Sequence, residues 1–374
     1  RRTMASCPCS AAMDSGVAER PITDFDAYND RLNRFVFRSG LIMKPIIAAA
    51  RASETRIIYS DGEDERVLRA AQVLLEDKLA RPILIGRPSV IESRCERFGL
   101  KIRPGTDFEF INPEDDPRYR DYVDTLHSLT GRRGVTPEAA RTMVRSNTTV
   151  IGALAVRRGE ADALICGLEG RYTKHLNNVK SIIGTAPGVQ DFSALSLLIN
   201  ATGATFFTDT YVTANPCARE IAEMTRLAAE EISLFGITPR AALLSASNFG
   251  SRDMASGEKM REALEILGEI APDLEVDGEM HGDSALSEAM RARVMPTSRL
   301  TGEANLLVFP NLDAANIALN LVKVMTESLH VGPILLGTAQ PAHILTPSVT
   351  SRGVVNMSAF ASVEAQTKRL AAED

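Results

Sequence analysis

Short apolar runs alternate with segments of helical periodicity along this chain, and that rhythm restricts the possible folds more than any other feature. The runs end at Gly, Pro or Asp, as in RIIYSDG (56–62), ARPILIGRP (80–88) and ADALICG (161–167). Between them, segments such as ERVLRAAQVLLED (65–77) place apolar residues at helical spacing. Repeated strand–helix units predict an α/β fold with parallel or mixed sheets flanked by helices.

The same alternation continues in the second half of the chain, in ATFFTDT (204–210), ITPRAALLSAS (237–247), ANLLVFPNL (304–312) and GPILLGTAQ (332–340). In sheets of this kind, ligands bind beyond the carboxyl ends of the strands. The polar loops that follow these runs are therefore the places where a binding site is expected.

The 374 residues carry a formal net charge of −6 and include five cysteines and five histidines. The acidic balance argues against a general nucleic-acid binder. Only Cys7 and Cys9 are close in sequence, and we interpret the cysteines as reduced thiols of a cytoplasmic protein. The sequence has no nucleotide-binding or zinc motif, no apolar run of membrane-spanning length and no apolar core of a signal peptide at its start. Motifs alone therefore establish no enzyme class, and no metal is expected.

The loop SASNFGS (245–251) follows the apolar run AALL and offers hydroxyls, an amide and a glycine. Its residues Ser247, Asn248, Phe249, Gly250 and Ser251 can present backbone N–H groups to a phosphate or a carbonyl. The alternative is an ordinary polar turn, and the sequence leaves both interpretations open.

Two further loops are candidates. In FPNLDAAN (309–316), Asn311 and Asn316 either bind a ligand or cap the helix that follows. In VTSRGV (349–354), the Ser351 hydroxyl and the Arg352 guanidinium stand beside Gly353, which permits close approach of the backbone. Such a group can hold an acyl carbonyl or a phosphate, or it can be a solvated turn.

Several motifs in register resemble phosphate acetyltransferases, with matching order and spacing over about residues 52–362. These motifs are IIYSDGEDERVLRAA, RRGVTPEAA, GEADALICG, IIGTAPGV, LLSASNFGS, DGEMHGDSAL, GEANLLVFPNLDAANIAL and the final SRG. In addition, residues 14–45 resemble the linker of the large bacterial NADP-dependent malic enzymes, in which a malic domain precedes a phosphotransacetylase-like domain. The chain is therefore identified as similar to that second domain.

The resemblance implies a two-lobed fold related to isocitrate and isopropylmalate dehydrogenases. It places a linker at 1–45, a first lobe at 46–187 plus 336–374, and a second lobe at 188–335. It also implies that the machinery for malate oxidation is not in this chain. The expected partners are the malic domain of the same polypeptide and further copies of the chain, as a homodimer or a higher homo-oligomer, without nucleic acid or membrane.

In active phosphate acetyltransferases, as the resemblance implies, a carboxylate takes the proton from the coenzyme A thiol, arginines hold the phosphate, and a Ser–Arg pair stabilises the oxyanion. Ser351 and Arg352 match the pair. Ser358 stands where the family has the aspartate, and Asn177 and Thr130 stand where it has arginines. Loss of a general base typically costs about 10²- to 10⁴-fold in rate.

We therefore expect a domain that binds acetyl-CoA or CoA through the three candidate loops, regulates a malic enzyme and forms oligomers without catalysing acetyl transfer. Two alternatives stay open at this point. The chain is an active phosphate acetyltransferase, or it is a purely structural dimerisation domain.

Overall fold

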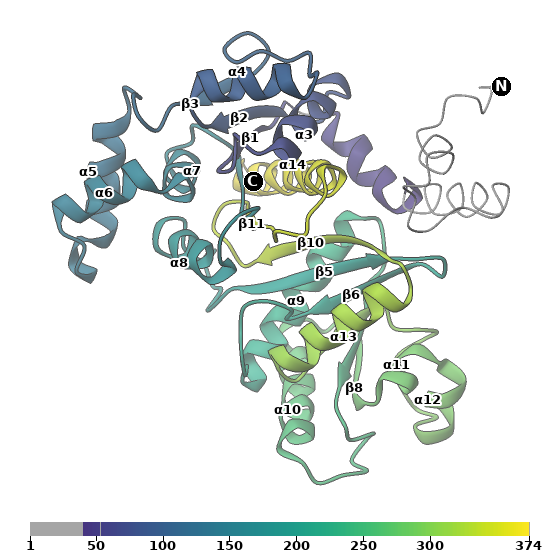
Figure 1. Ribbon diagram of the computed structural model, residues 1–374. Coiled ribbons are helices and arrows are strands. Elements are labelled where there is room, and N and C mark those ends of the chain that lie inside the picture. The colour runs from purple at the N-terminus through teal and green to yellow at the C-terminus, as the bar shows by residue number, and fades with distance from the viewer. Residues whose placement is uncertain (1–39, 53, 374) are drawn as a thin grey trace, which may run out of the picture.

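The computed structural model describes residues 40–52 and 54–373, which form two sheets with helices on both faces (Figure 1). The first sheet is entirely parallel, with the order β11-β4-β1-β2-β3. The second is mixed, with the order β10-β5-β6-β9-β7-β8, because β5 runs antiparallel to both of its neighbours. The predicted α/β class with parallel and mixed sheets is thus confirmed.

The strands of the first sheet are β1 (Arg56–Tyr59), β2 (Arg81–Ile85), β3 (Glu109–Ile111), β4 (Ala163–Cys166) and β11 (Ala342–Ile344). Those of the second sheet are β5 (Ser193–Ile199), β6 (Ala204–Thr208), β7 (Arg240–Leu244), β8 (Glu275–Met280), β9 (Leu306–Val308) and β10 (Leu329–Leu336).

Residues 40–50 are helical, and the later helices are α3 (Glu65–Glu76), α4 (Pro88–Arg97), α5 (Tyr119–Thr130), α6 (Pro137–Ser146), α7 (Thr148–Arg157), α8 (Tyr172–Ile182), α9 (Ala218–Leu234), α10 (Ala255–Ile270), α11 (Gly282–Leu286), α12 (Glu288–Val294), α13 (Leu312–Met325) and α14 (Ser351–Glu373). A short 3₁₀ turn, η2 (Gly131–Arg133), joins α5 to α6.

Successive side chains of the first sheet point to opposite faces, as the pleat of a strand requires. In β1, Ile57 and Tyr59 face α3, α4 and α14, whereas Ile58 faces the side covered by α5, α6, α7 and α8. Both faces are apolar, which explains why these strands are continuous hydrophobic runs in the sequence.

The second sheet is built in the same way. Phe206 of β6 packs toward α9 and α10, and the adjacent Phe207 packs toward α11 and α13. Since β6, β7 and β9 are parallel neighbours, the loops that follow them lie at one edge of the sheet.

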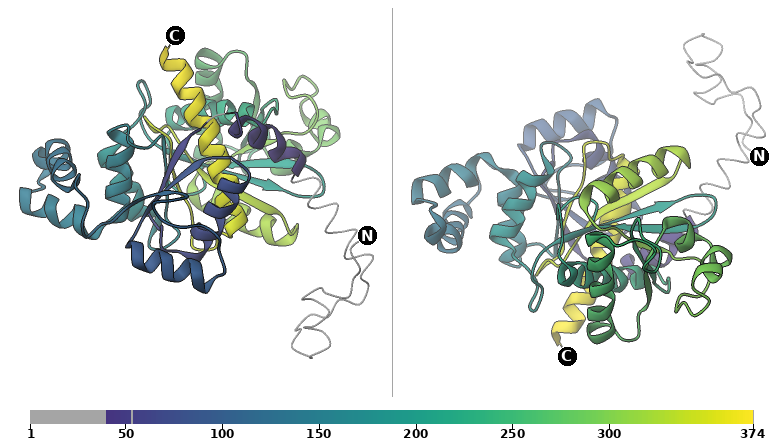
Figure 2. Two further views of the ribbon diagram at one scale, coloured as in Figure 1. Left: turned by 90° about the horizontal axis from the view of Figure 1, so that it is seen from above. Right: turned by 90° about the horizontal axis from the view of Figure 1, so that it is seen from below.

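One apolar core extends through both sheets on the side of α3, α9 and α14. Phe235, which follows α9, stacks on Phe360 of α14 with ring centroids 5.3 Å apart. The 40–50 helix lies beside α14 (Figure 2, left). Its Ile46 is buried in this shared core, and its Ala49 carbonyl accepts a hydrogen bond from Gln366 of α14.

The chain crosses between the sheets twice, and the two crossing segments lie side by side. The Ala186 N–H donates to the Gly337 carbonyl, and the Ala339 N–H donates to the Gly184 carbonyl. The division into lobes at residues 46–187 plus 336–374 and 188–335 stays a prediction. The linker expected at 1–45 and the pair Cys7–Cys9 fall largely or wholly outside the described residues.

Candidate functional site

The loop after β7 is ordered around one buried carboxylate, Glu279, at the end of β8. Glu279 Oε1 accepts hydrogen bonds from Ser247 Oγ (2.7 Å), the Gly250 N–H (2.8 Å) and Arg261 Nη1 (2.8 Å). Burial raises the pKa of this carboxyl, but the hydrogen bonds from Ser247, Gly250 and Arg261 together outweigh burial and hold the pKa below its usual value. Glu279 is therefore ionised and holds the loop in place.

The other loop residues are positioned by short-range contacts. Asn248 accepts from the His281 N–H and donates to Ser284 Oγ, and its own N–H donates to Ser251 Oγ. Phe249 and Gly250 both have positive φ, at 50° and 81°. This backbone is strained for the phenylalanine and relaxed for the glycine. The five predicted residues thus form one folded loop, but all five of their backbone N–H groups donate to acceptors within the protein. The expectation that these N–H groups are presented to a phosphate or a carbonyl is therefore wrong, and a ligand here would meet side chains and carbonyls.

The loop before α13 lies at the same edge, since β9 is the neighbour of β7. Asn311 is the N-cap of α13 and accepts from the Ala314 N–H at 2.9 Å, so the capping interpretation is confirmed for this residue. Asn316 lies inside α13, so the capping interpretation is wrong for this residue, and its side chain donates to the Thr210 carbonyl. Lys259 of α10 fastens this region by donating to the Pro310 carbonyl and to Asn215 Oδ1.

Ser351, Arg352 and Gly353 form the first turn of α14, which packs against the first sheet. The Gly353 N–H donates to Thr350 Oγ1, the N-cap arrangement of a helix start. A Cβ atom at Gly353 would lie 2.8 Å from the Val349 side chain, so only glycine fits without displacement. The N-terminal end of this long helix favours negative charge.

Ser358, one and a half turns further along α14, is fully buried. Its hydroxyl lies 2.6 Å from the Tyr59 hydroxyl and donates to the Val354 carbonyl. The hydroxyl is therefore hydrogen-bonded inside the protein, and a serine offers no carboxylate as a general base. Thr130 and Asn177, which stand where the resemblance implies arginines, also carry no charge. Thr130 is buried and donates to the Leu126 carbonyl, and Asn177 is exposed.

Two groups that the sequence did not single out lie at the carboxyl edge of the first sheet. Asp61 directly follows β1 and accepts from Ser60 Oγ and from the Leu168 N–H. Burial raises the pKa of Asp61 above its usual value, although both hydrogen bonds act to lower it. Arg66 of α3 donates to the carbonyls of Pro347 and Val349. In the sequence, the position of Asp61 at the end of an apolar run is its signal, whereas Arg66 has none.

The two sheets approach each other where α8 begins. The ring of Tyr172 stacks on that of Tyr211, which follows β6, with centroids 5.0 Å apart. Asp209 stabilises the loop that follows β6 by accepting from the N–H groups of Ala194, Tyr211, Val212 and Thr213. Burial nevertheless raises the pKa of Asp209. Asn316 contacts the same loop through Thr210, so the stacked tyrosines connect the two sheets close to one candidate residue.

Residues 41–362 match the family of phosphate acetyl/butaryl transferases. The chain belongs to this family. It is 36% identical over 332 residues to the phosphate acetyltransferase of Paracoccus denitrificans, a match that covers 86% of this chain and 99% of the relative. A phosphotransacetylase from Streptococcus pyogenes of known crystal structure shares 27% identity with a TM-score of 0.81, covering 87% of this chain and 98% of that one.

A phosphotransacetylase-type chain can also be part of a larger protein. The chain is 71% identical over 362 residues to the NAD-dependent malic enzyme of Rhizobium meliloti (strain 1021), covering 96% of this chain. It spans about half the length of that relative, 47%. The resemblance to the phosphotransacetylase-like part of malic enzymes is thus confirmed.

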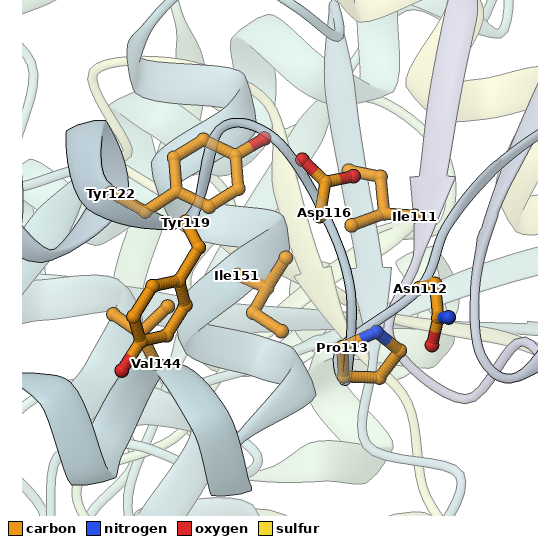
Figure 3. A pocket seen from close by; sticks show the side chains of 8 residues that line it. All are labelled: Ile111, Asn112, Pro113, Asp116, Tyr119, Tyr122, Val144 and Ile151. Atoms are coloured by element: carbon orange, nitrogen blue, oxygen red, sulfur yellow. The ribbon is translucent and has the colours of Figure 1, made fainter.

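A small pocket lies between the end of β3 and the helices α5, α6 and α7 (Figure 3), and none of the candidate loop residues lines it. Its lining residues are Ile111, Asn112, Pro113, Asp116, Tyr119, Tyr122, Val144 and Ile151. The space accommodates about one water molecule. A coenzyme A ester is far larger, so this pocket is not a candidate for its binding.

Within residues 40–52 and 54–373, no group of three or more His, Cys, Asp or Glu side chains is arranged to hold a metal ion. Cys95, Cys166 and Cys217 are free thiols. No helix in that part of the chain combines the length and apolar character needed to cross a bilayer.

Proposed function

We propose that the chain is the acetyl-CoA-binding regulatory domain of a malic enzyme, with little or no acetyl transfer activity. The observation that carries this proposal is the contrast between two parts of α14. Ser351 and Arg352 stand at its start, whereas Ser358, which the resemblance places at the position of the family's proton acceptor, is buried against Tyr59. Binding groups are retained while the base is lost.

The proposed ligand is acetyl-CoA or CoA. The loop at 247–251 and Asn316 would contact it on the side of the second sheet, and Ser351, Arg352 and Gly353 on the side of the first. Asn311 uses its Oδ1 to cap α13, so it would contact the ligand through its amide N–H groups. Support comes from the 247–251 loop, in which Glu279 accepts hydrogen bonds from Ser247 and Gly250 and so restricts the conformation of the loop. A preformed loop loses less entropy when a ligand arrives.

Regulation requires that acetyl-CoA bind with different affinity to two states of the whole enzyme. The partner in the proposal is the malic part that relatives of this chain carry in the same polypeptide. The Rhizobium relative is named NAD-dependent, whereas the resemblance implies NADP as the dinucleotide of that part.

Calorimetry with acetyl-CoA tests the binding half of the proposal. We expect saturable binding to the chain and weaker binding to Arg352→Gln, because the charge-assisted contact to the thioester or phosphates is lost. Arg97→Gln, an exposed arginine of α4, serves as the matched control and should bind like the unmodified chain. Absence of a saturable signal at millimolar acetyl-CoA contradicts the proposal.

A transferase assay with acetyl phosphate and CoA tests the other half. We expect turnover at least about 10²-fold below that of an active family member, the usual minimum effect of losing a general base. Turnover of tens per second would instead establish an active phosphate acetyltransferase, and Asp61 would then be the first proton acceptor to examine.

An oligomeric role is a second candidate function, and α13 favours it. Ile317, Leu321, Val324 and Met325 are 59%, 56%, 73% and 80% exposed, and their spacing places them along one side of the helix. Exposed apolar stripes of this kind mark interaction sites in soluble proteins. We propose that a second copy of the chain covers this face, which is compatible with the regulatory role.

A further inference from the structure

Arg66, the second residue of α3, donates hydrogen bonds to two other segments at the carboxyl edge of the first sheet. Its Nη1 donates to the Pro347 carbonyl (2.7 Å) and to the Val349 carbonyl (3.3 Å). Its Nη2 donates to the Leu168 carbonyl at 3.2 Å. One guanidinium therefore joins the start of α3, the end of β4 and the loop that leads into α14.

The guanidinium is itself held in a fixed orientation. Asp64 accepts from Arg66 Nε at 3.0 Å and from Nη2 at 2.8 Å, a two-point contact that defines the plane of the group. Burial raises the pKa of Asp64, but the bonds from Arg66 outweigh it and keep this pKa below its usual value. The Asp64 carboxylate and the Arg66 guanidinium are therefore both charged.

Leu168 is fixed on both sides of its backbone. Its N–H donates to Asp61 Oδ2 at 3.3 Å, and its carbonyl accepts from Arg66. Asp61 and Arg66 come from the same β1–α3 segment, so this segment sets the position of the residue that follows β4. The loop before α14 is then tied to the same point.

The two carbonyls in that loop lie just before the first turn of α14. Val349 precedes Thr350, whose hydroxyl caps the helix at Gly353. Holding the carbonyls of residues 347 and 349 fixes where α14 begins, and thereby where Ser351 and Arg352 stand.

We propose that Arg66 is a positioning residue that sets the location of Ser351 and Arg352 for recognition of the acyl group. Arg66 acts through the loop at 346–350 and does not touch the ligand. The proposal rests on the proposed function for its ligand, but the positioning itself does not. Lysine cannot replace the group, because a single ammonium does not reproduce a planar fork of donors.

Hydrogen exchange of the ligand-free chain tests the positioning. We expect Arg66→Gln and Arg66→Lys both to accelerate exchange at residues 346–356 by about tenfold or more, since charge-assisted bonds that hold the loop are lost. The control is Arg69→Gln in the same helix, whose exposed partner is Glu65. Should Arg66→Gln fail to fold, Arg66→Lys alone decides. Unchanged exchange in this segment for the lysine variant refutes the proposal.

Binding of two ligands tests the consequence for recognition. Acetyl-CoA affinity should fall about tenfold in Arg66→Lys, whereas affinity for unacylated CoA should change less than twofold, because one charge-assisted contact to the acyl carbonyl is misplaced. Equal weakening of both ligands means general damage and refutes the role in acyl recognition. If the unmodified chain binds neither ligand, the proposed function fails, and the exchange experiment still decides whether Arg66 positions the loop.

Discussion

Replacing Glu279 tests whether one buried carboxylate organises the 247–251 loop. Glu279→Gln keeps the shape of the side chain and one oxygen that can accept from Ser247 and Gly250. It removes the negative charge that faces Arg261, whose side chain is 41% exposed. Since hydrogen bonds to charged groups contribute about 1.5–3 kcal/mol, and exposure of Arg261 reduces this, we expect a loss of about 1–2 kcal/mol in the free energy of unfolding.

The alanine variant should be worse for a structural reason. Glu279→Ala leaves the Ser247 hydroxyl and the Gly250 N–H without their acceptor in a buried setting, and it creates a cavity. Each unsatisfied group costs about 1–3 kcal/mol, so a total of about 4 kcal/mol is expected. The matched control is Glu262→Gln, an exposed glutamate of the same helix as Arg261, which should change stability by less than about 0.5 kcal/mol.

Urea unfolding at a series of pH values provides the assay. The folded pKa of Glu279 lies below the unfolded value of about 4.3, so its contribution is complete above that pH and is lost as pH falls through the folded pKa. The stability gap between the unmodified chain and Glu279→Gln should therefore be constant from pH 8 to 5 and shrink in more acidic solution. A stability gap below about 0.5 kcal/mol at pH 7 would refute the reasoning, because hydrogen bonds to a charged group typically contribute more than that. A gap that widens on acidification would refute it as well.

Two further outcomes are expected. Burial, aided by the charge of Lys323, lowers the pKa of His330 to about 4, so the folded state favours its neutral ring. The free energy of unfolding should therefore fall by about 2 kcal/mol between pH 7.5 and 5. In urea titrations, His330→Gln should lose this pH dependence. An unchanged slope would show that His330 is not the group responsible. Leu321→Glu on α13 should reduce the mass seen by light scattering to that of one chain, whereas Leu370→Glu, on the exposed end of α14, should not. Equal masses for both variants and the unmodified chain would exclude α13 as the contact.

Much of the fold could be predicted because the first sheet buries both faces. Ile57, Ile58 and Tyr59 form an apolar run whichever face each one meets, and the run ends where the loop begins. The strand β8 gave no such signal, because its polar residues are buried with polar partners. Asp277 accepts from Ser298 and Glu279 accepts from Ser247, so EVDGEM does not read as a hydrophobic strand.

The candidate site divides in the same way. The loop at 247–251 could be predicted from its place after an apolar run, and Ser351–Gly353 from small and charged residues beside a glycine. Arg66 could not, since its contact with Pro347 joins residues separated by 281 positions and leaves no local pattern. For Asn311, sequence left capping and binding open, and only the bond from Ala314 identifies the cap.

The continuous apolar core shared by both sheets couples the unfolding of the two halves. Phe235 follows α9, which packs on the second sheet, and Phe360 lies in α14, which packs on the first, yet the two rings lie against each other. Loosening one half therefore removes packing from the other. We expect heat to melt both halves in one cooperative transition. Truncations that remove either half should yield aggregates, because they leave the remaining half with an exposed apolar surface.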